Sequence, residues 1–167
     1  MKTLLLLRHG KSSWDVESLP DRERPLASRG VKAARRMGRF LERVGPVPDR
    51  ILCSPAVRTV ETLRHAAEAG RWRAPADVVP ELYGASLRDV LACVGAVDAG
   101  VDTLLVVGHE PTCSQTASAL IGGAAVRFPT AALACIRLDA AAWDEVGPDR
   151  GALLWLVVPR VLARLDP

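Results

Sequence analysis

The sequence predicts an α/β fold in which a mostly parallel sheet is packed on both sides by helices. Short apolar runs alternate along the chain with segments of helical length and periodicity. Three of the apolar runs are continuous, which is typical of strands buried on both faces. Histidine and arginine side chains directly follow some of these runs, and the carboxyl ends of strands are where open α/β sheets bind ligands. These three observations set the architecture and point to one edge of the sheet.

The expected elements follow one another with short turns between them. Strands are predicted at Thr3–Leu7, Arg50–Cys53, Thr103–Val107, Ala132–Leu138 and Leu153–Val158. Helices are predicted at Arg29–Val44, Pro55–Ala69, Ser86–Val97 and Pro111–Leu120. The last two strands have no long helix between them, so we expect one of them to run antiparallel at an edge. Residues 45–49 and 147–151 are turns to which we assign no function.

Length and composition indicate one globular domain over residues 1–167. The chain is long enough to bury a core, and its 49% hydrophobic and 25% charged residues are ordinary for a globular protein. The apolar run before Arg8 is too short for a signal peptide, and no run approaches the length of a membrane span. We therefore expect a cytoplasmic protein without a membrane partner. The net charge of +3 does not indicate a nucleic-acid partner, and the sequence does not predict an oligomeric state.

The four cysteines are scattered along the chain, with no close pair and no cluster with histidine. They are Cys53, Cys93, Cys113 and Cys135. This spacing argues against a zinc site and against a disulfide framework. We expect all four to be buried as small hydrophobic residues.

Residues 29–44 predict an amphipathic helix with a basic outer face. The basic residues at helical spacing are Arg29, Lys32, Arg36, Arg39 and Arg43, and the apolar residues opposite them are Ala34, Met37, Leu41 and Val44. A solvated helix face is the simpler interpretation. A docking surface for an acidic partner is the alternative.

Two histidines each come at the end of a predicted strand. His9 follows Arg8 at the end of the first strand, and His109 follows Gly108. Because the carboxyl ends of parallel strands meet at one edge of a sheet, we expect both histidines to lie there together with Arg8.

A third junction carries Arg58 to the same edge. Ser54 is a suitable N-cap and Pro55 suits the first helical position. A helix N-terminus attracts anions, and Arg58 in the first turn is placed to direct its planar guanidinium to the same point. The alternative is a capped helix with an exposed arginine.

Together these side chains suit a phosphate dianion. Arginines and helix N-termini bind phosphate well, whereas histidines without carboxylates or cysteines at ligand spacing make a poor metal site. Neutral imidazole is a nucleophile near pH 7, so one histidine is expected to attack phosphorus and water to hydrolyse the resulting phosphohistidine. The arginines and the second histidine would stabilise the developing charge.

Three segments in this order and spacing resemble the motifs of the histidine phosphatase superfamily, also called phosphoglycerate mutase-like. They are residues 7–10 (LRHG), 54–62 (SPAVRTVET) and 107–110 (VGHE). Residues 11–15, 21–26 with 29–30, and 81–83 are further similar to the short SixA-type phosphohistidine phosphatases. The resemblance extends from Leu4 to about Leu120.

The resemblance implies a three-layer α/β/α fold and metal-independent hydrolysis without a cofactor. It implies His9 as the nucleophile, with Arg8, Arg58 and His109 completing the phosphate pocket. Residues Lys11 and Ser12 follow the nucleophile closely enough to contact phosphate.

The general acid is less firmly assigned by the resemblance. Such an acid protonates an alkoxide leaving group and accelerates the reaction by roughly 10²–10⁴. Glu81 occupies the segment where the superfamily often keeps this acid, and Asp15 and Glu110 are the other candidates. The alternative for Glu81 is a surface glutamate after a turn.

The sequence thus predicts a metal-independent phosphatase that forms a covalent phosphohistidine intermediate. A phosphorylated partner is implied, and a phosphohistidine protein is one candidate because the short chain leaves the site open. A phosphomonoesterase acting on a small sugar or nucleotide phosphate is an alternative. A non-catalytic phosphate-binding or scaffold protein is another, although both histidines and both arginines are present.

Overall fold

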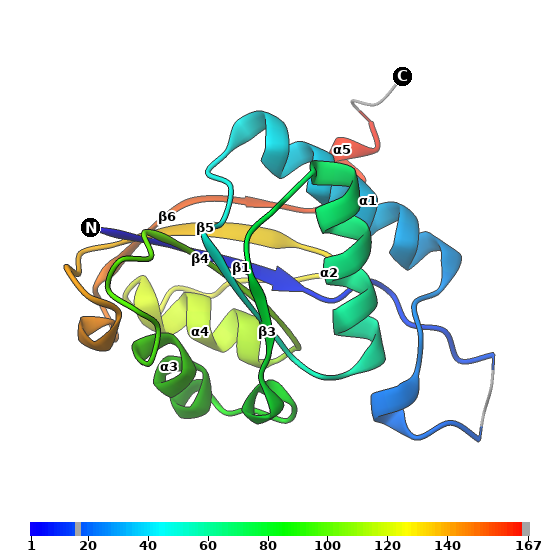
Figure 1. Cartoon of the computed structure of the whole chain (residues 1–167), viewed down its shortest axis with the longest axis horizontal. Helices are drawn as coiled ribbons and strands as arrows, with labels where there is room; N and C mark the ends of the chain where they lie inside the picture. The colour runs from blue at the N-terminus through cyan, green and yellow to red at the C-terminus, as the bar shows by residue number, and fades with distance from the viewer. Residues whose placement is uncertain (16–17, 165–167) are drawn as a thin grey trace.

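The computed structural model describes residues 1–15 and 18–164 and contains one six-stranded sheet (Figure 1). The strands are β1 (Lys2–Arg8), β2 (Arg50–Cys53), β3 (Ala76–Val78), β4 (Thr103–Gly108), β5 (Leu133–Leu138) and β6 (Gly151–Val157). Their order in the sheet is β3-β2-β4-β1-β5-β6. Strands β1 to β4 are parallel, and β5 is antiparallel to both of its neighbours. The mostly parallel α/β fold predicted from the sequence is therefore confirmed.

Helices cover both faces of the sheet and make a three-layer α/β/α structure (Figure 1). The α-helices are α1 (Ser28–Val44), α2 (Val57–Gly70), α3 (Leu87–Gly95), α4 (Thr112–Leu120) and α5 (Pro159–Leu162). Short 3₁₀ turns are η1 (Asp21–Glu23), η2 (Pro80–Leu82) and η3 (Trp143–Glu145). No helix among the described residues is long and apolar enough to cross a membrane.

The apolar run of β1 serves two separate cores, one on each face. Leu5 and Leu7 pack with Met37 of α1, whereas Leu4 and Leu6 belong to the core under α3 and α4. All four leucines are almost completely buried, and burying each contributes roughly 1.5–3 kcal/mol. Because both faces are covered, the strand is apolar throughout and cannot show an alternating pattern.

Close backbone contact fixes the loop after β1 against α1. A Cβ on Gly10 would lie 2.9 Å from the carbonyl oxygen of Gly30, and a Cβ on Gly30 would collide with the backbone of Lys11. The backbone N–H of Ala27, just before α1, donates to the carbonyl of Lys11 over 2.8 Å. Both glycines are therefore needed for the loop after β1 to approach α1 this closely. This contact holds His9, between Arg8 and Gly10, at the edge of the sheet.

The structure corrects several details of the prediction. The antiparallel strand β5 lies inside the sheet, and β6 forms the edge. Val44, expected on the buried face of the basic helix, is 55% exposed because α1 ends there and the chain turns away at Gly45. Three cysteines are buried as expected, but Cys93 is only half-buried.

The start of α2 also differs from the prediction. The helix begins at Val57 rather than Pro55, and the N-cap position is Ala56. The hydroxyl of Ser54 does not cap the helix, because it is hydrogen-bonded to His109 instead. The Ser54 side chain therefore positions His109 at the edge of the sheet.

Candidate active site

The two strand-end histidines lie next to each other at one edge of the sheet. Arg8 and Gly108 occupy paired positions on the neighbouring parallel strands β1 and β4. The backbone N–H of His9 donates to the carbonyl of Gly108 over 3.0 Å. The ring centroids of His9 and His109 are 5.3 Å apart. The structure therefore brings the histidines together as the parallel topology predicts.

The His9 ring is held in one orientation by its own loop. Its Nδ1 atom lies 2.7 Å from the backbone carbonyl oxygen of Gly10. Since a carbonyl can only accept a hydrogen bond, Nδ1 carries the proton and Nε2 keeps a free electron pair. The backbone N–H of Gly10 donates to the hydroxyl oxygen of Thr62 in α2 over 2.9 Å, which fixes this loop in turn.

The environment keeps His9 neutral. Burial lowers the pKa of His9 to about 4, and the nearby His109, Arg58 and Arg8 act in the same direction against the hydrogen bond to Gly10. The side chain is only 9% exposed. Near pH 7 the ring is therefore uncharged and nucleophilic at Nε2.

The second histidine is fixed by contacts from two other elements. The Nε2 atom of His109 lies 2.7 Å from the hydroxyl of Ser54, and its Nδ1 lies 3.5 Å from a guanidinium nitrogen of Arg58. The guanidinium can only donate, so Nδ1 accepts and Nε2 carries the proton. Burial and the charge of Arg58 lower the pKa of His109 to about 4.

The guanidinium of Arg58 is clamped by Asp21 in η1. It donates to the Asp21 backbone carbonyl over 2.6 Å and to the carboxylate over 2.9 Å. The hydroxyl of Tyr83 donates to the same carboxylate over 3.0 Å. Partial burial acts to raise the pKa of Asp21, but the bonds from Arg58 and Tyr83 and the charge of Arg24 hold it below its usual value. Asp21 is therefore an ionised positioning group near pH 7.

A pocket of about 220 Å³ opens in front of His9. Its lining residues are Arg8, His9, Lys11, Ser12, Trp14, Asp21, Arg24, Arg58 and Thr130. Arg8 is held by a hydrogen bond of 2.8 Å to the carbonyl of Phe128, while its buried Nε has no hydrogen-bond partner among the described residues. The structure thus places Lys11 and Ser12 in this pocket with Arg8 and Arg58. Four cationic side chains facing a neutral histidine suit a phosphate group.

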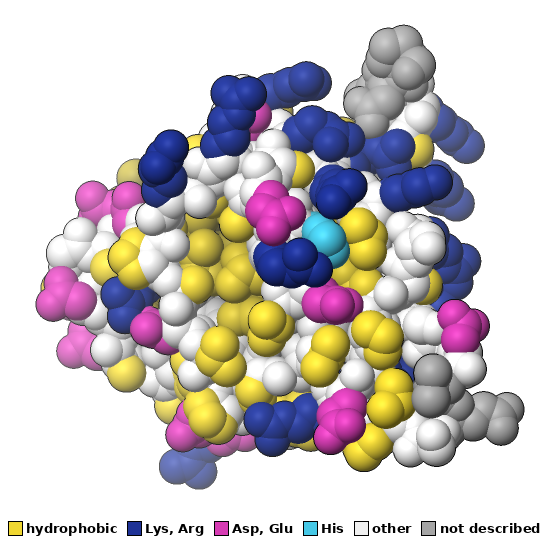
Figure 2. Space-filling view, turned by 45° about the vertical axis from the view of Figure 1, so that its right-hand side comes forward, with side chains coloured by type: hydrophobic (Ala, Val, Ile, Leu, Met, Phe, Trp, Pro, Cys, Tyr) yellow, Lys and Arg dark blue, Asp and Glu magenta, His cyan; other side chains and the backbone are white. Residues whose placement is uncertain are grey.

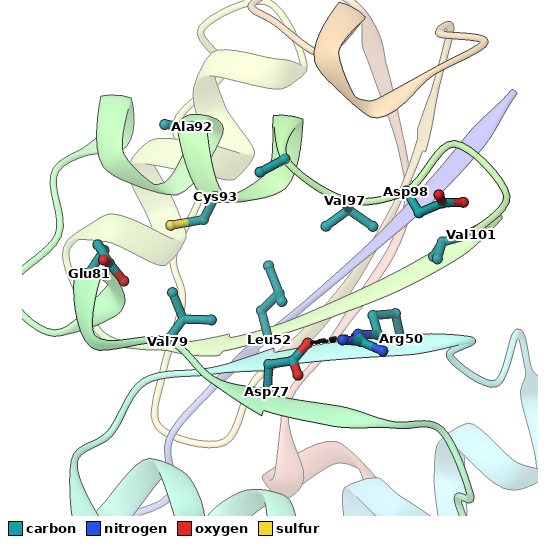
Figure 3. Close-up of a pocket in the computed structure, with 11 residues that line it drawn as sticks. Arg50, Leu52, Asp77, Val79, Glu81, Ala92, Cys93, Val97, Asp98 and Val101 are labelled. Carbon is teal, nitrogen blue, oxygen red and sulfur yellow. Dashed lines mark hydrogen bonds and ion pairs between the residues drawn. The ribbon is translucent and has the colours of Figure 1, made fainter.

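The three carboxylates proposed as general acid do not line this pocket. Glu81 lies instead on a separate cavity of about 660 Å³, near Cys93 and Val79 and at the end away from the Arg50–Asp77 ion pair (Figure 3). Leu82 is buried in the core, so the 3₁₀ turn η2 directs its neighbour Glu81 to that cavity. Glu81 therefore lines a different cavity from the one in front of His9, which argues against its role as the general acid.

Asp15 and Glu110 are occupied by local hydrogen bonds. The Asp15 carboxylate accepts from the hydroxyl of Ser13 over 2.6 Å. The Glu110 carboxylate accepts from the backbone N–H of Ser114 over 3.2 Å, in the first turn of α4. Both contacts are typical of turn and helix-start carboxylates.

Sequence reasoning assigned no role to four pocket residues, which are Trp14, Asp21, Arg24 and Thr130. Arg24 stacks over the Trp14 ring at 3.2 Å, contacts the hydroxyl of Ser12 and forms an ion pair with Asp21. In the sequence, only the similarity of residues 11–15 and 21–26 to SixA-type phosphatases points to Trp14, Asp21 and Arg24. No sequence feature points to Thr130. Within the described residues, no group of three or more His, Cys, Asp or Glu side chains is arranged to hold a metal ion.

Comparison of the chain with known proteins identifies the family to which it belongs. The profile of the histidine phosphatase superfamily (branch 1) matches residues 4–90, a span that includes His9 and Arg58. An uncharacterised protein of Mycobacterium tuberculosis is 40% identical over 164 residues, covering 92% of this chain and 100% of the relative. The phosphohistidine phosphatase SixA of Escherichia coli is 28% identical over 139 residues, covering 81% of this chain and 85% of that protein.

The fold is shared with a solved structure of the same kind. The protein histidine phosphatase SixA, determined in complex with tungstate, superimposes with a TM-score of 0.83 at 28% identity, covering 96% of this chain and 99% of that one. Family profile, sequence relatives and fold agree with one another. The chain belongs to branch 1 of the histidine phosphatase superfamily and is a histidine-based phosphatase.

Proposed function

We propose that this phosphatase removes phosphate from phosphohistidine side chains of proteins, with His9 as the nucleophile. The observation that carries this choice is the state of Asp21. Among the described residues that line the pocket, Asp21 is the only carboxylate, and Arg58, Arg24 and Tyr83 keep it ionised. An ionised carboxylate has no proton to give to a leaving alkoxide.

The leaving group decides which substrates such a site can use. A serine or sugar alkoxide must receive a proton on the oxygen that leaves. A phosphohistidine ring can take a proton from water on its other nitrogen, and it then leaves as neutral imidazole. A pocket without a protonated carboxyl therefore favours the P–N bond over the P–O bond.

The proposed first step transfers the phosphoryl group between two imidazoles. The free electron pair on Nε2 of His9 forms a bond to phosphorus as the P–N bond to the substrate ring breaks. That bonding pair stays with the substrate ring, whose other nitrogen carries the proton. Arg8 and Arg58 would bind the phosphoryl oxygens. The clamp from Asp21 keeps Arg58 in position, and Nδ1 of His109 accepts from the same guanidinium.

The second step returns the enzyme to its starting state. Water forms a bond to phosphorus, the P–Nε2 bond breaks, and its electron pair returns to His9. The water proton passes to a phosphate oxygen, and inorganic phosphate leaves. The Gly10 carbonyl holds the Nδ1 proton throughout, so His9 leaves as a neutral ring.

The relatives support the same substrate class. The E. coli relative is named a phosphohistidine phosphatase, and the similar solved structure is a protein histidine phosphatase that binds tungstate, an oxyanion with the shape of phosphate.

Rapid quenching with a ³²P-labelled phosphohistidine peptide tests the nucleophile. We expect an acid-labile adduct that maps to His9 and is missing in His9→Ala, whose activity falls by about 10³ or more. Persistent activity in His9→Ala without an adduct would overturn the mechanism.

A matched phosphoserine peptide of the same sequence tests the substrate class. We expect kcat/KM for the phosphohistidine peptide to be at least about 10² higher, which is the lower range of general-acid effects. A panel of sugar and nucleotide phosphates belongs in the same experiment. Equal or faster turnover of the phosphoserine peptide or of a small phosphate would contradict the proposal.

A further inference from the structure

A second, larger cleft adjoins the phosphate pocket. It has a volume of about 620 Å³, and its lining residues are Arg8, Lys11, Arg29, Ala33, Pro129, Thr130, Val158, Pro159 and Arg160. Arg8, Lys11 and Thr130 also line the pocket in front of His9. A molecule bound through its phosphoryl group at His9 can therefore continue into this cleft, which we call the basic cleft.

The charge of the basic cleft is one-sided. Four of its lining residues are cationic, and none of the described residues that line it is acidic. Within residues 1–15 and 18–164, no carboxylate forms an ion pair with Lys11, Arg29 or Arg160. Figure 2 shows Lys and Arg side chains gathered over the side of the molecule where α1 and α5 lie. The cleft thus has positive charge available for a ligand.

Arg29 lies in the first turn of α1, where a positive charge destabilises the helix. It is the second residue of α1, and no acidic residue occupies that first turn. The partial positive charge of a helix N-terminus favours anions and disfavours cations at this position. A residue that opposes its local preference points to a functional requirement, and an anion bound between Arg29 and the helix start would satisfy both charges.

The other lining residues of the cleft are mostly apolar. Ala33, Pro129, Val158 and Pro159 are apolar, and Thr130 adds one hydroxyl. A second phosphate group needs donors that converge on one point, whereas the cations of this cleft come from β1, the loop after it, α1 and α5 and share the lining with apolar side chains. This arrangement suits an extended chain segment with acidic side chains.

We propose that the basic cleft binds an acidic segment of the phosphoprotein substrate, next to its phosphorylated residue, and so selects substrates by their flanking sequence. This inference rests on the proposed protein substrate and adds its recognition element. Arg29 and Arg160 are the specificity residues, because they line the cleft without lining the pocket at His9. Of the cations on the basic helix, only Arg29 lines the cleft, and Arg39 and Arg43 are exposed outside it.

The test uses two phosphohistidine peptides that differ only in having Glu or Gln at the flanking positions. The variants are the double substitutions Arg29→Gln with Arg160→Gln, and Arg39→Gln with Arg43→Gln as a matched control. The control pair carries the same charge change and lies on α1, about 15 Å or more from Arg29 along the helix. Phosphoimidazole, which is too small to reach the cleft, reports the basal activity.

At about 50 mM salt we expect the wild type to prefer the Glu peptide about tenfold in kcat/KM, mainly through KM. In the Arg29/Arg160 variant the preference should fall to about twofold, with unchanged phosphoimidazole turnover and an unchanged or higher melting temperature. The control variant should keep the preference. Equal kcat/KM for both peptides in the wild type, or the same preference in all three proteins, would overturn the proposal.

Fluorescence anisotropy of the unphosphorylated Glu peptide separates this inference from the proposed function. If no phosphopeptide is hydrolysed but the Glu peptide binds the wild type about tenfold more tightly than the Arg29/Arg160 variant, the cleft assignment is supported and the substrate assignment fails. If both proteins bind it equally, the cleft assignment fails whatever is hydrolysed. Tighter binding of a small bisphosphate than of the Glu peptide would also overturn it, in favour of a second phosphate.

Discussion

The hydroxyl of Thr62 joins the loop after β1 to helix α2 through Gly10. Its oxygen accepts from the Gly10 backbone N–H over 2.9 Å, and the hydroxyl donates to the backbone carbonyl of Arg58 over 2.6 Å. Gly10 in turn supplies the carbonyl that fixes the tautomer of His9. One buried hydroxyl therefore links the backbone beside the proposed nucleophile His9 to the backbone of Arg58, the proposed phosphate-binding arginine.

Replacing Thr62 by Val should affect both stability and activity. The substitution leaves the buried Gly10 N–H without an acceptor, a loss of about 1–3 kcal/mol in the free energy of unfolding. We also expect kcat to fall about tenfold or more, because the Gly10 carbonyl no longer holds the His9 ring firmly. Urea unfolding and steady-state kinetics measure the two effects.

Thr116→Val is the matched control for this prediction. Thr116 is also fully buried, but its hydroxyl has no hydrogen-bond partner among the described residues. Removing an unpaired buried hydroxyl is neutral or stabilising, and activity should stay at the wild-type level. Equal losses in both variants would mean that the Thr62 contacts have no special role.

Gly30→Ala should displace the loop that carries His9, the proposed nucleophile, although Gly30 itself lies in α1. The added methyl group would collide with the backbone of Lys11, so α1 or the loop carrying His9 must shift. We expect a loss of about 1–3 kcal/mol in the free energy of unfolding together with a clear loss of kcat. A variant with wild-type kcat would show that the loop tolerates the shift.

Gly95→Ala provides the comparison for Gly30. Gly95 is the last residue of α3, and a Cβ there would meet its nearest neighbours at an ordinary distance of 3.6 Å. Alanine favours the helix by roughly 0.5–1 kcal/mol over glycine. Stability should therefore be unchanged or higher, and kinetics should be unchanged.

The central strands could be predicted from the sequence because their short, continuous apolar runs are typical of strands buried on both faces. The apolar run of β1 and that of β4 are each buried on both faces, so length and composition identify them. β3 was missed because it is a three-residue edge strand whose residues are exposed or half-buried, and so it shows no burial pattern. Helix α5 has only four residues and shows no periodicity.

Candidate site residues could likewise be predicted where they end a regular strand, but not where they lie in irregular segments. His9 and His109 end strands that the sequence identifies, so their meeting follows from parallel topology. Asp21 belongs to an irregular loop, and its contact with Arg58 spans 37 residues, so no local pattern announces it. The cavity that Glu81 lines could not be predicted, because the sequence does not show which way a short 3₁₀ turn directs its side chains.

Glu81→Gln should leave catalysis almost unchanged. Its side chain faces the cavity that holds Cys93 rather than the pocket at His9. We expect kcat/KM for both an alkyl phosphate and a phosphohistidine peptide to stay within about twofold of wild type, as for exposed side chains outside a site. His9→Ala, assayed beside it, shows that the measured activity is enzymatic. A selective loss on the alkyl phosphate would restore Glu81 as a general acid.

The low pKa values of the two histidines in the candidate active site make the free energy of unfolding depend on pH. Both His9 and His109 have a pKa of about 4 in the folded chain, against an ordinary histidine value of 6.5. Between these values the unfolded chain binds more protons than the folded one, so the free energy of unfolding falls as the pH drops from 6.5 to about 4. The lowered pKa of Asp21 acts in the same direction but only below its ordinary value of 3.8.

NMR titration of the ring protons should place the midpoints of His9 and His109 near pH 4, and a midpoint near 6.5 for His9 would contradict the buried neutral ring. The stability consequence is checked by urea unfolding of the wild type and of His9→Gln at pH 7 and pH 4.5. A shift of this size corresponds to a loss on the order of 3 kcal/mol from His9 in the wild type. His9→Gln has no such proton to bind, so its stability should fall less over the same interval, and equal falls in the two proteins would rule out His9 as the titrating group.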